Sequence, residues 1–167
     1  MQRHVLSIIV DNHAGVLSRV SGLFSRRGYN IDSLSVGETE NPEISRITVS
    51  VTCDNIIIEQ IMKQVEKLID VRDVFELKAD ESVFRELALI KIKVDIRNRV
   101  EVVGIVDIFR ANIIDVSNMS ITVVITGDDG KISAFTKLME PYGVLEIART
   151  GLTGLKRGLS TETIEEQ

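Results

Sequence analysis

The pattern of apolar and polar residues in the first half of the chain predicts six secondary-structure elements. Two stretches place apolar residues every three or four positions, which is typical of amphipathic helices. Four others are rich in branched apolar residues or alternate apolar with polar side chains, which is typical of strands with one buried face. The predicted order is strand 4–10, helix 15–27, strand 30–38, strand 44–53, a helix that follows Asp54-Asn55 with apolar spacing up to Ile69, and strand 71–78.

The same order recurs after the polar segment 78–82, which reads as a linker. The second set comprises strand 86–96, helix 99–111, strands 113–117 and 119–126, helix 129–140 and strand 143–149. Strand–helix–strand crossovers of one hand place both helices of each set on one face of a four-stranded antiparallel sheet. The sequence therefore predicts an α+β fold of two tandem ferredoxin-like βαββαβ domains, residues 1–79 and 83–158, followed by a flexible polar tail, residues 159–167.

The candidate binding site lies where the loop Asp11–Gly15 enters the first predicted helix. The first backbone N–H groups of a helix lack internal partners, and the helix dipole adds positive charge there, which favours an anion such as a carboxylate. Gly15 has no side chain to block close approach, and Asn12 can both donate and accept hydrogen bonds. Asn30 follows the helix, so it is predicted at the end opposite Gly15. It can approach the helix N-terminus only if a second chain supplies it. An ordinary turn with a structural glycine is the alternative interpretation.

Composition limits the partners and the compartment. The net charge of −5 and the shortness of the basic clusters argue against nucleic acid as a partner. Cys53, the one cysteine, cannot form an internal disulfide, which suits a reducing compartment, and its place in an alternating strand predicts a small core residue. No apolar run approaches the roughly 20 residues of a membrane span. We therefore expect a cytoplasmic protein with no membrane partner.

No catalytic or metal-binding constellation is visible in the sequence. His4 and His13 are the only histidines and do not form a pair on a helix, so no zinc site is predicted. No serine or cysteine has the context of an activated nucleophile. The segment Thr126–Lys131 lacks the glycine spacing of a phosphate-binding loop. Carboxylates of the predicted helices, Asp70 among them, are expected on solvated faces.

Short motifs in both halves of the chain carry a resemblance to a known family. The motifs are Asn12-x-x-Gly15-x-Leu17-Ser18-Arg19-Val20, Gly22-Leu23-Phe24-Ser25-x-Arg27-Gly28-Tyr29-Asn30-Ile31, Ser45-Arg46, Ile108-Phe109-Arg110, Ile114-Asp115-Val116, Gly130-Lys131-x-x-Ala134-Phe135, Ala148-Arg149-Thr150-Gly151 and Gly154-Leu155-x-Arg157-Gly158. Residues 11–34 resemble the start of an ACT domain, a small amino-acid-binding regulatory module. The ordered set, up to about residue 158, resembles the regulatory (small) subunits of acetolactate synthase, also called acetohydroxyacid synthase.

The resemblance implies a regulatory subunit that is not itself an enzyme. Such a subunit binds and activates a separate catalytic large subunit, which makes acetolactate and acetohydroxybutyrate, and it confers feedback inhibition by valine in branched-chain amino acid biosynthesis. The resemblance also implies that thiamine diphosphate, Mg and FAD belong only to the large subunit, so no cofactor is expected in this chain.

The family's effector site maps onto six residues of this sequence. They are Asn12, Gly15, Val16 and Leu17 at the first helix, and Asn30 and Ile31 before the second strand. The resemblance further implies a homodimer through the ACT domains, with the effector between chains, so that Asn30 can come from the neighbouring chain. Two alternatives remain open: a free-standing amino-acid-sensing ACT protein with another target, and a small enzyme on the same fold.

Overall fold

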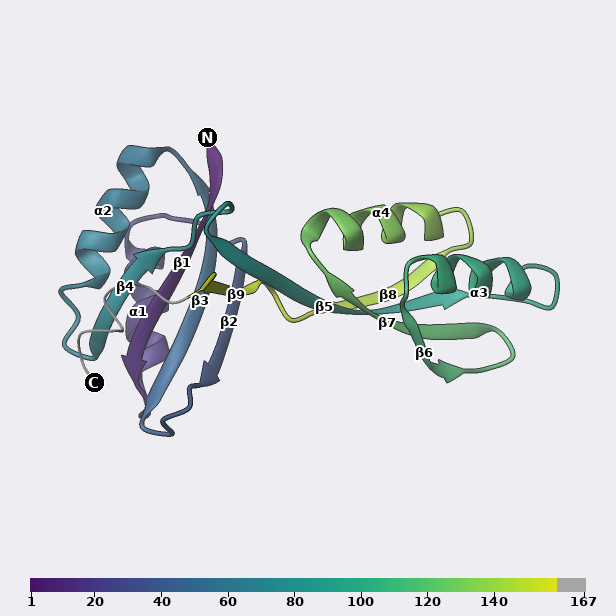
Figure 1. The fold of residues 1–167 in the computed structure, drawn as a ribbon, viewed down its shortest axis with the longest axis horizontal. Coiled ribbons are helices and arrows are strands. Elements are labelled where there is room, and N and C mark those ends of the chain that lie inside the picture. The colour runs from purple at the N-terminus through teal and green to yellow at the C-terminus, as the bar shows by residue number, and fades with distance from the viewer. Residues whose placement is uncertain (159–167) are drawn as a thin grey trace. The chain divides into compact units, whose positions relative to one another are not determined.

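The computed structural model describes residues 1–158, so the predicted tail, residues 159–167, lies outside the described residues. The chain divides into two compact units (Figure 1). The first comprises residues 1–83 together with the segment that begins at Leu152, and the second comprises Phe84–Gly151. None of the helices in the described residues is long and apolar enough to cross a membrane.

The first unit has the predicted order of elements. They are β1 (Gln2–Asp11), α1 (Val16–Arg26), β2 (Ser33–Glu38), β3 (Ile44–Cys53), α2 (Asn55–Val65) and β4 (Val71–Glu76). The strands form an antiparallel sheet in the order β2-β3-β1-β4, which leaves β2 and β4 as its edges. The two helices cover one face of this sheet, as the ferredoxin-like prediction requires (Figure 1).

The core of the first unit follows from the two periodicities of its sequence. Val16, Val20 and Phe24 recur every four residues along α1 and are buried against the sheet. The alternating apolar residues of β3 meet them from the other side. Cys53 is among them, with 8% of its surface exposed. Burial, followed by the nearby Asp54 carboxylate, raises the pKa of its thiol, so Cys53 is the core residue that the alternation predicts.

The second unit repeats the topology. Its elements are β5 (Ser82–Lys93), α3 (Arg99–Ile108), β6 (Asn112–Val116), β7 (Ser120–Gly127), α4 (Asp129–Met139) and β8 (Val144–Arg149). The sheet order is β6-β7-β5-β8, and helix residues such as Val106 and Phe135 are buried on one face of it. Phe109 and Phe135 pack edge to face, with ring centroids 5.4 Å apart. The prediction of two βαββαβ folds in tandem is therefore confirmed.

A ninth strand, β9 (Thr153–Lys156), has no counterpart in the predicted elements. It pairs with β5, a strand that begins in the first unit at Ser82, and Arg157 N–H donates to the Glu81 carbonyl over 2.8 Å. Leu152 N–H donates to Ser33 Oγ over 3.3 Å. The Lys156 ammonium lies 4.4 Å from the centre of the Phe75 ring. These contacts place residues 152–158 with the first unit, although the sequence assigned them to a domain covering residues 83–158. The segment lies against the sheet face opposite the helices, where Thr48 is only 2% exposed.

Candidate functional site

The loop that joins β1 to α1 is held by backbone hydrogen bonds at its start. Asp11 N–H donates to the Asp70 carbonyl over 2.9 Å, and Asn12 N–H donates to the Glu43 carbonyl over 2.7 Å. The loop ends at Gly15, the N-cap of α1, with φ 91° and ψ −14°. Glycine adopts this left-handed conformation at little cost, whereas other residues are strained there. At Gly15 the chain therefore enters α1 without a side chain that would cover the helix N-terminus.

The first turn of α1 leaves backbone donors unused. Arg19 N–H reaches the Gly15 carbonyl over 3.0 Å, and Val16 N–H reaches the His13 carbonyl only over 3.5 Å. Among residues 1–158, no hydrogen bond uses the N–H groups of Leu17 or Ser18, and no acidic residue occupies the first turn. These donors and the positive end of the helix dipole suit a carboxylate.

The Asn12 side chain has one hydrogen-bonding group, its Oδ1 acceptor, available to a ligand. Its Nδ2 donates to the Pro42 carbonyl over 2.8 Å and to Glu38 Oε1 over 3.2 Å, so both amide hydrogens are used within the chain. The side chain is exposed, and no described residue donates to its Oδ1. Asn12 therefore offers an acceptor held in place by its own donors, which suits an ammonium group.

An ion-pair network lies beside this loop. Asp70, 6% exposed, contacts His13 Nε2 over 3.0 Å through Oδ1. Arg19 Nε lies 2.6 Å from Asp70 Oδ2, but its N–H is not directed at that oxygen, so the contact is an ion pair without a hydrogen bond. Arg19 Nη1 lies 3.9 Å from where a Cβ on Gly15 would be, which brings positive charge to the helix N-terminus. The expectation that Asp70 is solvated is therefore wrong, because its side chain is buried and paired with His13 and Arg19.

The same network argues against a metal ion at this place. Donor atoms of Asp11, His13 and Asp70 lie within 4.8 Å of one another. Asp11, however, is ion-paired with Arg72 Nε over 2.5 Å, and Asp70 is paired with Arg19. Two guanidinium groups already supply the positive charge that a cation would bring, so the cluster is a salt-bridge network.

The predicted apolar residues of the site differ in what they can contact. Val16 is 3% exposed and lies in the core, so its side chain does not line a surface site. Leu17 is 42% exposed, on the outer side of the same turn. Ile31 is half-buried against the core. Leu17 and Ile31 are therefore the two predicted apolar residues that can meet a ligand.

A single chain does not bring all six predicted residues together. Asn30 is exposed, and its Nδ2 donates to Asp32 Oδ1 over 3.4 Å. Gly15 precedes α1 and Asn30 follows it, and a helix of 11 residues is about 16 Å long. The depression of about 420 Å³ beside the loop is lined by Asn12 but by none of the other five. Asn12, Gly15 and Leu17 form one group, and Asn30 and Ile31 form another.

Sequence reasoning missed the two residues that give this site its charge. Arg19 appears in the sequence only as part of a family motif, and Asp70 appears as one polar residue among many at the end of the second predicted helix. Their approach depends on the turn between α2 and β4 reaching the β1–α1 loop, which a local pattern does not reveal. The signal that was present is the pair Asp11 and His13, two ionisable residues in a loop of five.

Comparison with known proteins agrees with the fold. The family model described as "AHAS small subunit-like ACT domain" matches residues 6–73, and the model described as "Small subunit of acetolactate synthase" matches residues 85–158. The first match makes the first unit an ACT domain. Taken together, the two matches and the relatives below show that the chain belongs to the family of acetolactate synthase small subunits.

Relatives from distant organisms match over nearly the whole chain. The acetolactate synthase small subunit of Mycobacterium bovis is 49% identical over 155 residues, which cover 93% of this chain and 92% of that protein. The probable small subunit of Archaeoglobus fulgidus is 47% identical over 156 residues, covering 93% and 98%. The crystal structure of the Thermotoga maritima small subunit superposes with a TM-score of 0.89 at 41% identity, covering 96% and 100%.

Proposed function

We propose that this chain is the non-catalytic regulatory subunit of acetolactate synthase. It binds and activates the catalytic large subunit and makes that subunit sensitive to valine. Thiamine diphosphate, Mg and FAD belong to the large subunit in this proposal. Family membership supports a regulatory role for this chain and catalysis by the large subunit, because the relatives are small subunits of that synthase.

The observation that carries the valine site is the pair of unused N–H groups at Leu17 and Ser18 beside a glycine. The carboxylate of valine lies on the N–H groups of Gly15 to Leu17, extended by Ser18, with the Arg19 guanidinium nearby. The ammonium group binds Asn12 Oδ1, and the isopropyl group contacts Leu17. With such an apolar contact, the binding free energies of two amino acids whose side chains differ by one methylene differ by only about 1–3 kcal/mol.

A second copy of the chain completes the site. Strand β2 is an edge of the first sheet, and an edge strand presents unpaired backbone groups to another chain. Pairing of two such edges gives a twofold dimer in which each surface meets its own copy. In this dimer Asn30 and Ile31 of one chain close the site that Asn12, Gly15 and Leu17 of the other chain begin. Valine then stabilises one arrangement of the dimer, and it regulates through its differential affinity for the arrangements.

Isothermal titration calorimetry on Gly15→Asp tests the site. The new carboxylate would occupy the place of the valine carboxylate, and losing charge-assisted hydrogen bonds of about 1.5–3 kcal/mol each reduces valine affinity by about 100-fold or more. Gly15→Asn is the matched control, because Asn tolerates the left-handed conformation and has the same shape without the charge. Asn should therefore reduce affinity less than Asp. Equal valine affinity in wild type and Gly15→Asp would exclude this placement.

Mixing the protein with an acetolactate synthase large subunit tests the wider proposal. The wild-type chain should raise the activity of the large subunit, and valine should lower it again. Gly15→Asp should still activate but should no longer confer inhibition. Valine binding without any effect on the large subunit would instead favour the free-standing sensor. Sedimentation of the full chain should show a dimer, and a monomer in the presence of saturating valine would contradict the shared site.

A further inference from the structure

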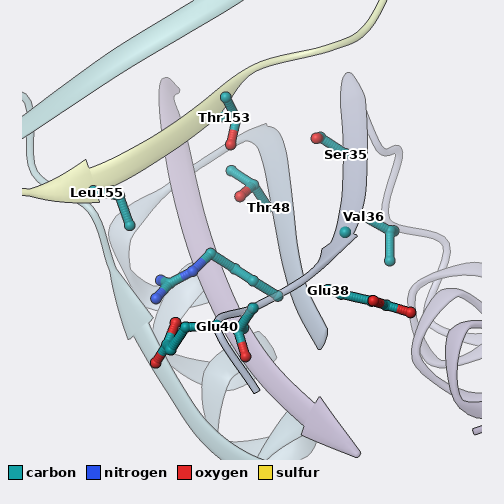
Figure 2. Close-up of a pocket in the computed structure, with 10 residues that line it drawn as sticks. Ser35, Val36, Glu38, Glu40, Thr48, Thr153 and Leu155 are labelled. Carbon is teal, nitrogen blue, oxygen red and sulfur yellow. The ribbon is translucent and has the colours of Figure 1, made fainter. Parts of the chain in front are cut away.

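The first unit carries a second concave site, on the sheet face opposite the helices. It is a polar cleft of about 220 Å³ between β2, β3 and β9. Figure 2 shows Thr153 and Leu155 of β9 on one side, with Thr48 of β3 below Thr153. The volume is smaller than the roughly 300–1,000 Å³ of pockets for drug-sized ligands, which suits a small metabolite. The cleft shares only Glu38 with the surroundings of the β1–α1 loop.

Arg46 of β3 lines this cleft and lacks a counter-ion. It is half-buried, and its Nη1 donates to Ser7 Oγ over 2.7 Å. No carboxylate of residues 1–158 forms an ion pair with it. Removing a charged group from water without pairing it costs free energy, and the guanidinium fork matches a carboxylate with two parallel hydrogen bonds. Arg46 therefore points to a carboxylate ligand.

The hairpin between β2 and β3 adds negative charge at the edge of the cleft. Glu38 accepts a hydrogen bond from Asn12, and Figure 2 shows its side chain pointing away from Thr48 and Thr153. Glu40 is exposed, and no described residue forms a hydrogen bond or ion pair with its carboxylate. A cleft with one unpaired cation and one unpaired anion is complementary to a zwitterion.

We propose that this cleft binds a free α-amino acid with a small polar side chain. The carboxylate pairs with Arg46, and the ammonium group faces Glu40. The hydroxyl groups of Ser35, Thr48 and Thr153 surround the side chain, which favours a polar ligand over valine. The site is separate from the proposed valine site, and its existence does not depend on that site.

A titration of the full-length protein with L-serine, followed by two-dimensional ¹⁵N–¹H NMR, tests the cleft. Saturable shifts should appear at the amides of Ser35, Thr48 and Thr153. Arg46→Gln should weaken binding at least about tenfold, because the carboxylate loses a charge-assisted pair. Arg97→Gln is the control, since Arg97 is an exposed arginine of the second unit and the change in charge is the same. Arg46→Lys, which keeps the charge but loses the fork, should weaken binding several-fold even if Arg46→Gln folds poorly.

Two further ligands separate the zwitterion from a simple anion and from the valine site. 3-Hydroxypropionate has the carboxylate and the side-chain hydroxyl group of L-serine without the ammonium, so it should bind more weakly than L-serine, and Glu40→Gln should weaken only L-serine. Equal binding of both ligands, unaffected by Glu40→Gln, would overturn the zwitterion assignment. Gly15→Asp should lose valine and keep L-serine, and Arg46→Gln should do the reverse. Absence of saturable shifts at the cleft, or loss of those shifts in Gly15→Asp, would overturn the proposed site itself.

Discussion

The two units share one topology, but the loops that enter their first helices differ. In the second unit, the Asp95 carboxylate accepts hydrogen bonds from the N–H groups of Arg97 (2.7 Å) and Asn98 (3.1 Å), and Asn98 Oδ1 accepts from Asp95 N–H over 2.8 Å. In the first unit, Gly15 occupies the N-cap and provides no side-chain hydrogen bond. Neither N-cap residue makes a side-chain hydrogen bond to its helix, but the loop before α3 is held by a carboxylate of the chain and the loop before α1 ends in a bare glycine.

Negative charge at the helix N-termini distinguishes α1 from the other three helices of the described residues. Glu101 lies in the first turn of α3, Asp129 lies in the first turn of α4, and Asp54 precedes α2. The first turn of α1 has no acidic residue, and its cap is Gly15. Because acidic groups at a helix N-terminus are stabilising, their absence from α1 forgoes stability where a ligand carboxylate is proposed to bind.

The outer faces of the two sheets also differ. In the first unit this face is polar, with Ser7 and Ser50 buried beneath the segment that carries β9. In the second unit the corresponding face leaves Leu89 exposed and carries an exposed ion pair between Lys91 and Glu146 over 2.9 Å. The segment that carries β9 therefore covers the outer face of the first unit's sheet. We infer that β9 contributes to the stability of the first unit.

Truncation after Gly151 should have the largest effect, because it removes β9 and the buried Leu152 side chain. We expect the free energy of unfolding of the first unit to fall by about 2–3 kcal/mol while the second unit is unaffected. Chemical denaturation should resolve the change. Alkylation of Cys53 should accelerate roughly 30- to 150-fold, because burial and a raised pKa keep its thiol unreactive until the first unit opens.

Truncation after Gly158 is the control for this experiment, since it keeps all of β9. Its unfolding and its Cys53 alkylation should match those of the full chain. If both truncated chains unfold alike, β9 does not contribute to the first unit in the way that we infer.

Local pattern predicted most of the fold because most elements have one buried face. Helix 15–27 is Val16–Arg26 in the structure, and helix 129–140 is Asp129–Met139. The pattern failed where the chain pairs over long distances or where apolar residues are not buried. Strand β9 is four residues long and pairs with β5, about 70 residues earlier in the chain. Helix α2 ends at Val65 although the apolar spacing continues to Ile69, which is 93% exposed.

The candidate site was predictable only as far as one chain defines it. Asn12, Gly15 and Leu17 lie together because they are neighbours in one loop and one helical turn. The inward orientation of Val16 follows from its spacing to Val20 and Phe24, so the sequence contained that signal. The grouping of Asn30 with Gly15 requires a second chain, and Asp70 joins the loop only through tertiary contacts.

The same substitution, glycine to alanine, should change the free energy of unfolding in opposite directions in the two units. Gly15→Ala forces a side chain into a left-handed conformation, so we expect a loss of about 1–2 kcal/mol in the free energy of unfolding. Gly104→Ala lies inside α3, where an added Cβ meets no atom within 4 Å, so we expect a gain of about 0.5–1 kcal/mol. Chemical denaturation checks both. A neutral Gly15→Ala would mean that the loop relaxes to another conformation.

Asp95→Asn should have the smallest effect and should depend on pH. The N–H groups of Asn98 and Arg97 hold the pKa of Asp95 below its usual value. A lowered pKa in the folded state stabilises the protein above the ordinary pKa of aspartate, and this stabilisation is lost as pH falls through the lowered value. Wild type should therefore melt above Asp95→Asn at about pH 7, and the two should converge at about pH 2.

Asp73→Asn is the matched control for Asp95→Asn, since no described residue forms a hydrogen bond or ion pair with the exposed Asp73 side chain. Its melting temperature should follow wild type at every pH. A constant difference between wild type and Asp95→Asn across this range would show that the charge of Asp95 does not close the loop. The contrast with Gly15 would then rest on backbone conformation alone, because neither loop would depend on the charge of a carboxylate.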